Sequence, residues 1–112
     1  MNPLYGYLPS NLNDLNVQNC IALTSLNGLQ EINSIAGELS IVGNSSLIDL
    51  SGLDNLTSID FRLSITNNLS LSSISDLSNL VSVGENLDVN DCPSLKSITG
   101  LEGLTVILGC VY

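Results

Sequence analysis

The sequence repeats itself at a constant interval of 24 residues. Four six-residue stretches, LNVQNC, LSIVGN, LSITNN and LDVNDC, resemble one another, and they begin at Leu15, Leu39, Leu63 and Leu87. Successive leucines are 24 residues apart each time, so no repeat carries an insertion. A fixed period of this size indicates an array in which each unit buries its apolar face against the next unit. The repeat constrains the fold more than any other feature of the chain.

Apolar residues occupy the same places in every repeat. When each repeat is numbered from the residue before its first leucine, positions 2, 4, 10, 13, 16, 19 and 22 hold Leu, Ile or Val throughout. Positions 2 and 4 lie two residues apart, which is typical of a strand with one buried face. Positions 10 to 22 recur every third residue, which favours tight turns, 3₁₀ segments or very short strands over a long α-helix. We therefore expect the inward side chains to form seven stacked ladders.

This pattern predicts a mainly β, right-handed solenoid of four 24-residue turns with one short-stranded parallel sheet. The turns are assigned to residues 14–37, 38–61, 62–85 and 86–109. Residues 1–13 are interpreted as an N-terminal cap-like segment, and residues 110–112 as the start of an incomplete fifth turn. Solenoids need polar caps on their terminal turns. Since none is visible after residue 109, we expect either a fragment of a longer solenoid or end-to-end self-association through the C-terminal turn.

Two further positions in the repeat carry recurring small or polar residues. Position 7 holds Cys20, Asn44, Asn68 and Cys92, and it follows a turn at position 6. An inward Asn there can bond to backbone groups that the bend leaves unpaired, and Cys is a small apolar substitute for it. We expect Cys20 and Cys92 to be buried free thiols, because three turns of about 4.8 Å separate them. Position 15 marks a corner and holds Gly28, Gly52, Asp76 and Gly100.

Composition excludes several classes of function. The chain has no His, which removes Ser-His-Asp, Cys-His and His-metal chemistry. Two basic residues against eleven acidic ones give a net charge of −9, which disfavours nucleic acid and anionic membrane as partners. No apolar run reaches the length of about 18 residues that a membrane helix needs, and the first twenty residues do not resemble a signal peptide. We expect no enzyme, no cofactor and no bound metal.

The motif L-x-[IV]-x-x-[NC]-x-x-L resembles the leucine-rich repeat, including its alternating Asn/Cys position at Cys20, Asn44, Asn68 and Cys92. The 24-residue period and the absence of a helical stretch are more similar to the receptor L-domain branch, whose repeats form a β-helix-like solenoid. The resemblance covers residues 12–109. It implies a non-enzymatic module that binds proteins or glycans, or serves as a scaffold, at the cell surface or outside the cell.

The outward face of the expected sheet is the predicted site of partner binding. Strand alternation turns positions 1, 3 and 5 outward. The residues assigned to the site are Glu38, Ser40, Arg62, Ser64, Thr66, Asp88 and Asn90. An ordinary solvated sheet is the alternative, because this face carries no aromatic residue to anchor a partner. Arg62 follows Glu38 in the same ladder, so a cross-strand ion pair between them is expected.

Three other hypotheses remain open. Serines recur at positions 9, 12 and 21, and such ladders could belong to a structural or ice-binding solenoid, although Thr is sparse. Asp88, Asn90 and Asp91 faintly resemble a calcium loop, but no glycine or distal Glu completes it. Glycosylation sequons begin at Asn44, Asn55 and Asn68, and only Asn55 lies outside the buried ladder.

Overall fold

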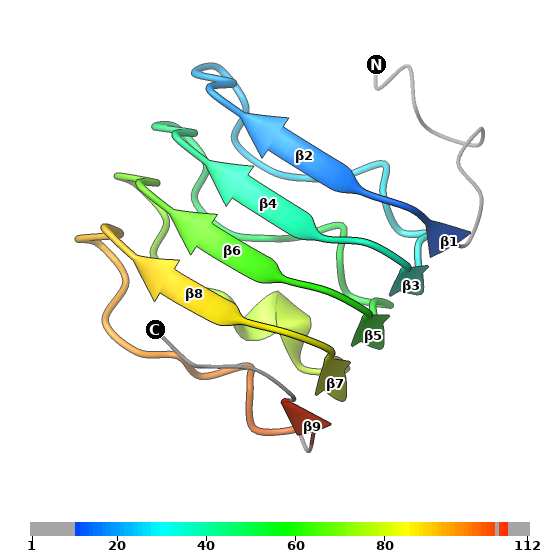
Figure 1. The fold of residues 1–112 in the computed structure, drawn as a ribbon. Coiled ribbons are helices and arrows are strands. Elements are labelled where there is room, and N and C mark those ends of the chain that lie inside the picture. The colour runs from blue at the N-terminus through cyan, green and yellow to red at the C-terminus, as the bar shows by residue number, and fades with distance from the viewer. Residues whose placement is uncertain (1–10, 105, 108–112) are drawn as a thin grey trace.

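The computed structural model describes residues 11–104 and 106–107, and they form a β-solenoid of about three turns. Its main sheet contains four parallel strands in chain order: β2 (Leu15–Gln18), β4 (Leu39–Val42), β6 (Leu63–Thr66) and β8 (Leu87–Asn90). Leu15 pairs with Leu39, which pairs with Leu63, which pairs with Leu87, so the register equals the 24-residue period (Figure 1). The mainly β solenoid predicted from the repeat is therefore confirmed.

A second parallel sheet corrects the prediction of a single one. It joins five two-residue strands: β1 (Asn11–Leu12), β3 (Ser34–Ile35), β5 (Ser58–Ile59), β7 (Ser82–Val83) and β9 (Val106–Ile107). Strands of two residues are too short to produce an alternating pattern in the sequence. They form because equivalent extended residues of successive turns lie side by side and complete one another's backbone hydrogen bonds.

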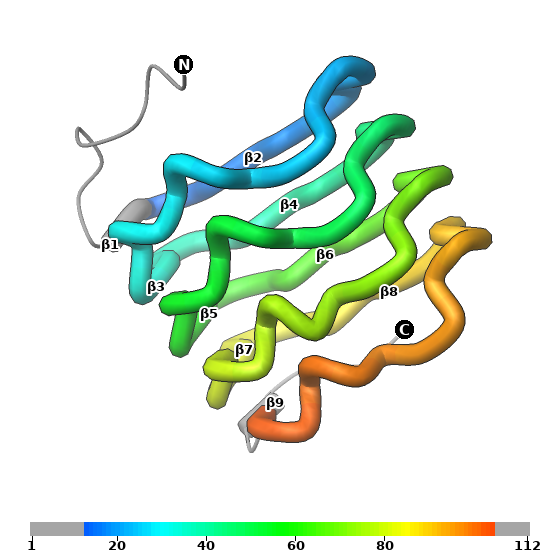
Figure 2. Tube along the Cα trace, turned by 180° about the vertical axis from the view of Figure 1, so that it is seen from behind, coloured from blue at the N-terminus to red at the C-terminus, as the bar shows by residue number. Residues whose placement is uncertain are grey.

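The winding of the chain is visible from the two opposite views. In Figure 1 the main strands lie in front and run to the left, while Figure 2 shows the return segments on the far side. Successive turns descend from the N-terminal to the C-terminal part of the chain, which makes the coil right-handed. Within the described residues the return segments contain one helix, the 3₁₀ helix η1 (Ser75–Leu77). None of the described helices is long and apolar enough to cross a membrane.

The core consists of the predicted ladders. Every buried apolar side chain of the described residues occupies position 2, 4, 10, 13, 16, 19 or 22 of its repeat. The terminal turns differ from the expectation, because they have a neighbouring turn on one side only. Leu15, Val17 and Leu23 of the first turn are only partly buried, and Ile98 of the last turn is 59% exposed. Burial at an inward position therefore depends on having a turn on both sides.

The predicted inward asparagines form a continuous hydrogen-bonded ladder. Asn44 and Asn68 are both 0% exposed. The backbone N–H of Asn44 donates to Oδ1 of Asn68 (3.0 Å), and the N–H of Cys20 donates to Oδ1 of Asn44 (2.9 Å). The side-chain amides also bond backward, from Asn44 Nδ2 to the Val17 carbonyl (2.9 Å) and from Asn68 Nδ2 to the Ile41 carbonyl (2.9 Å). Each buried amide thus satisfies backbone groups at the bend after a strand.

The two predicted corners are confirmed by the backbone angles. The residues at position 6 all have positive φ: Asn19 (56°), Gly43 (72°), Asn67 (57°) and Asp91 (55°). Asn, Asp and Gly are the residues that reach this left-handed region most readily. At position 15, Gly52 has φ 115°, and its N–H donates to the Asp54 carboxylate (2.9 Å). Asp76 replaces this glycine in the third turn, where the chain forms η1 instead.

Some predictions fall partly or wholly outside the described residues. Of the cap-like segment 1–13, the structure describes residues 11–13, and β1 lies there as an edge strand next to β3. The predicted incomplete fifth turn at residues 110–112, with Cys110, is not among the described residues. End-to-end association through that region accordingly stays a prediction.

Candidate functional site

The main sheet brings the predicted binding residues onto its outward face. Ser40 pairs with Ser64, which pairs with Asp88, and these three form one row across β4, β6 and β8. Thr66 pairs with Asn90 and makes a parallel row two residues further along the strands. Glu38 and Arg62 precede their strands, and the Leu39 N–H donates to the Arg62 carbonyl (2.9 Å). All seven predicted residues thus lie along one sheet.

These residues differ in how accessible they are. Arg62 and Asn90 are exposed, while Glu38, Ser64, Thr66 and Asp88 are half-buried. Ser40 is only 8% exposed, although its place in the strand turns it outward. Its side chain is short, and Asn16 and Ser64 flank it on the neighbouring strands. Ser40 is therefore a poor contact residue, and the accessible part of the face lies on β6 and β8.

The charged groups of the face are arranged differently from the prediction. No ion pair between Glu38 and Arg62 forms within the described part of the chain. The Asp14 carboxylate instead accepts a hydrogen bond from the backbone N–H of Glu38 (2.9 Å). On β8, Nδ2 of Asn90 donates to the Asp88 carboxylate. The guanidinium of Arg62 is therefore available to a partner, because an exposed pair across strands gains little in water.

Phe61 is a candidate contact residue that the repeat pattern does not reveal. It is 54% exposed and directly precedes Arg62. Its N–H donates to the Gly37 carbonyl (3.0 Å), and its own carbonyl accepts from Glu85 N–H (2.8 Å), so neighbouring turns hold the backbone in place. The other described repeats have Gly37 and Glu85 at this position, which therefore gives no ladder signal. An exposed aromatic ring beside an arginine is a favourable anchor for a protein partner.

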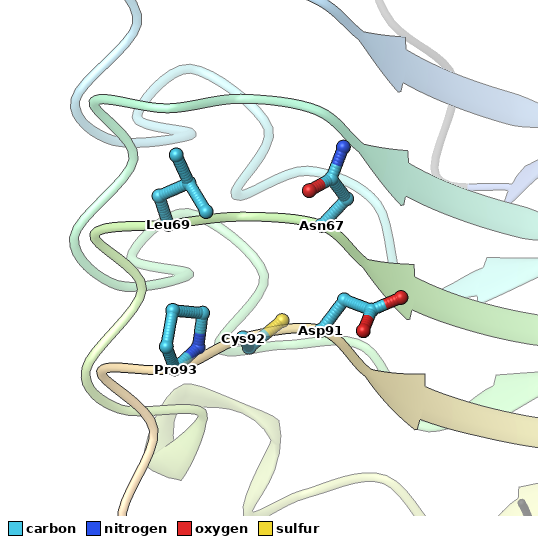
Figure 3. Close-up of a pocket in the computed structure, with 5 residues that line it drawn as sticks. All are labelled: Asn67, Leu69, Asp91, Cys92 and Pro93. Atoms are coloured by element: carbon cyan, nitrogen blue, oxygen red, sulfur yellow. The ribbon is translucent and has the colours of Figure 1, made fainter.

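An open depression lies at the bends that follow β6 and β8 (Figure 3). It has a volume of about 510 Å³ and is lined by Asn67, Leu69, Asp91, Cys92 and Pro93. Leu69 and Pro93 occupy the same position of successive turns, and Leu69 is 53% exposed. Two smaller depressions lie along the last turn, near Ile98. Open depressions of this kind do not exclude water from a reacting group, in contrast to enclosed ligand sites.

The cysteines and carboxylates offer little for catalysis or metal binding. Cys20 is exposed and Cys92 is half-buried, which corrects the expectation that both are buried. Both belong to terminal turns, where a ladder position is covered on one side only. Among the described residues no three His, Cys, Asp or Glu side chains come together to hold a metal ion. The calcium-like stretch at Asp88, Asn90 and Asp91 is therefore not supported by a cluster of ligands.

Two carboxyl groups have clearly shifted pKa values. Burial raises the pKa of Asp76, and Asp49 and Asp54 raise it further, although the carboxylate accepts a hydrogen bond from Leu50 N–H (3.0 Å). The pKa of exposed Glu102 is lowered by the hydrogen bond from the backbone N–H of Gly100. Each group supports the backbone at a corner of the coil. Neither belongs to the outward face.

The serine ladders on the flanks bond mainly to the backbone. Ser46 Oγ donates to the Ile21 carbonyl (2.6 Å), and Ser94 Oγ donates to the Leu69 carbonyl (2.8 Å). In both cases the acceptor belongs to the preceding turn. Small hydroxyl side chains at these positions therefore link neighbouring turns.

No protein-family model, curated protein or solved structure matches this chain. What can be stated of its class is the fold itself, a mainly β solenoid with parallel strands at 24-residue spacing.

Proposed function

We propose that this chain is a non-enzymatic binding or scaffolding module of the leucine-rich-repeat type, similar to the receptor L-domain branch. The observation that supports a binding role is the outward face of β6 and β8. The side chains of Arg62, Ser64 and Thr66 make no hydrogen bond within the described residues. Most other polar side chains at the bends of the coil bond to a neighbouring turn. Polar groups that the fold does not use are free to meet a partner.

The chemistry of this face favours a polar ligand. Hydroxyl, amide and carboxylate groups stand in rows on a flat surface, which suits hydrogen bonding to a glycan or to a polar protein surface. Phe61 and Arg62 at the start of β6 add the residue types that contribute most to protein interfaces. The net charge of −9 favours partners with a basic surface and repels phosphate-rich ones.

The absence of a catalytic role and a location outside the cell are parts of the same proposal. The core is filled by Leu, Ile and Val, and the depressions that the structure describes are open to water. Nothing in such a surface concentrates a perturbed acid and base on one substrate. The extracellular location rests on the resemblance of the repeat to surface-displayed solenoids.

A structural or ice-binding role is the alternative, and the hydroxyl groups argue against its ice-binding form. Ser46 and Ser94 use their hydroxyls to bond the preceding turn, so they do not present a regular array to water. Thermal hysteresis of the purified chain tests this alternative directly. A clear hysteresis gap would favour ice binding over the partner-binding face.

A matched pair of arginine variants tests the binding face. The purified chain, tetramerised to raise its avidity, is applied to arrays of glycans and of extracellular proteins. Ser64→Arg places a long charged side chain in the middle of the face, while Ser70→Arg adds the same side chain at an exposed bend. We expect binding to be lost with Ser64→Arg and kept with Ser70→Arg. Binding that survives Ser64→Arg would refute the proposed face.

Self-association is the second kind of partner that we propose. Ile98 is 59% exposed, and Leu95 and Leu101 beside it in the last turn are only partly buried. Light scattering of the reduced chain measures its mass in solution. A ladder of larger species that disappears with Ile98→Glu would support association through this turn, and a monodisperse monomer would oppose it.

A further inference from the structure

The chain contains three N-x-S/T sequons, and the structure separates them into two kinds. They begin at Asn44, Asn55 and Asn68. Asn44 and Asn68 belong to the buried ladder, whereas Asn55 lies exposed in a turn of the second repeat. N-glycosylation of such a sequon attaches a bulky, hydrated group to the side-chain amide. The three sites therefore have different consequences for folding.

The amide nitrogens of Asn44 and Asn68 are committed to the fold. Asn44 Nδ2 donates both to the Val17 carbonyl (2.9 Å) and to Oδ1 of Asn68 (3.2 Å). Asn68 Nδ2 donates to the Ile41 carbonyl (2.9 Å). Glycosylation forms a bond from this nitrogen to the anomeric carbon of a lipid-linked oligosaccharide, expels the lipid pyrophosphate and removes one N–H proton. It would therefore remove a donor and place a sugar where the neighbouring turn already packs.

The amide of Asn55 is placed differently. Its Nδ2 donates to the Gln30 carbonyl (2.9 Å) at an exposed position, and this leaves its second N–H directed to solvent. Thr57, which completes the sequon, is also exposed. A sugar on Asn55 could extend into water without displacing a neighbouring turn.

We propose that N-glycosylation at Asn44 or Asn68 and folding of this solenoid exclude one another, and that Asn55 alone accepts a glycan in the folded protein. Since oligosaccharide is transferred to the nascent chain before it folds, the chain matures only along a route in which these sequons are not modified first. If the protein is displayed outside the cell, it reaches that place by such a route. This inference does not depend on the proposed binding face.

The test compares sequon variants of the whole chain secreted from a eukaryotic cell behind an added leader. Ser46→Ala with Ser70→Ala removes both buried sequons and keeps both asparagines. Ser46→Thr with Ser70→Thr keeps the hydroxyls and raises sequon use, because Thr is the better acceptor residue. Thr57→Ala removes the exposed sequon as a matched control. The same variants made in the bacterial cytosol, without glycosylation, report the effect of each substitution on melting alone.

We expect the alanine pair to be secreted at least tenfold better than the unchanged chain, and the threonine pair to be secreted less well. The secreted alanine pair should carry one glycan, which Thr57→Ala removes. Peptide mass analysis should find glycans at Asn44 or Asn68 only in the retained, protease-sensitive pool. Glycans at either residue in secreted protein with native melting would overturn the inference, as would equal secretion of all three chains.

Discussion

Replacing Asn68 by Ala should destabilise the solenoid far more than its single side chain suggests. Oδ1 of Asn68 accepts from the backbone N–H of Asn44 (3.0 Å) and from Asn44 Nδ2 (3.2 Å). Both donors belong to a residue that is 0% exposed. Removing Oδ1 leaves them without their acceptor inside the core, and the Ile41 carbonyl also loses the donor Asn68 Nδ2.

The size of the effect follows from the two stranded donors. A buried polar group without a partner costs about 1–3 kcal/mol, so two such groups amount to roughly 2–6 kcal/mol. The free energy of unfolding of a small domain is about 5–15 kcal/mol. With an m-value of about 2 kcal/mol per molar urea, the lower limit corresponds to a midpoint about 1 M lower. The substitution should therefore shift the whole transition measurably.

Urea unfolding monitored by circular dichroism measures the change, and Asn67→Gly is the matched control. Asn67 precedes Asn68 but is exposed and has φ 57°, and the equivalent residue of the preceding turn is already Gly43. This control should stay within about 1 kcal/mol of the unchanged chain. Hydrogen exchange should show faster exchange of the Asn44 amide in Asn68→Ala only. A loss of less than about 0.5 kcal/mol in Asn68→Ala would refute the role assigned to the ladder.

Two further predictions test the register and the pH dependence. Leu63→Asp should lower the free energy of unfolding by at least about 4 kcal/mol, because it buries an unpaired charge at a residue that is 0% exposed. Ser64→Asp should be tolerated, since Asp88 occupies the next place in that outward row; equal urea midpoints for these two variants would contradict the register. Burial raises the pKa of Asp76 in the folded state, so its ionisation removes stability as pH rises above the ordinary value of 3.8. Asp76→Asn should therefore melt at a higher temperature than the unchanged chain at pH 7, with the difference shrinking below pH 3.8; a lower melting temperature at pH 7 would show that the hydrogen bond to Leu50 outweighs the burial.

The sequence by itself determined the period, the inward ladders and the corners. In a solenoid each turn stacks on a copy of itself, so a residue meets its equivalents 24 places away along the chain. A position that must be apolar, such as Leu39 or Leu63, is therefore apolar in every repeat. The same holds for Asn44 and Asn68, and for the left-handed bends at Gly43. Repetition turns a packing requirement into a pattern that can be read in one chain.

Only the tertiary structure decided the features that differ between turns. The second sheet escapes the pattern because a two-residue strand has no period of its own. Whether an inward residue is buried depends on the number of turns that cover it, and for this reason Leu71 is buried while Ile98 is exposed. The accessible binding surface was likewise decided by neighbours, since Ser40 is covered on its sheet and Phe61 stands free at a bend. A repeat encodes what each turn shares with the next, whereas exposure depends on how many neighbours each turn has.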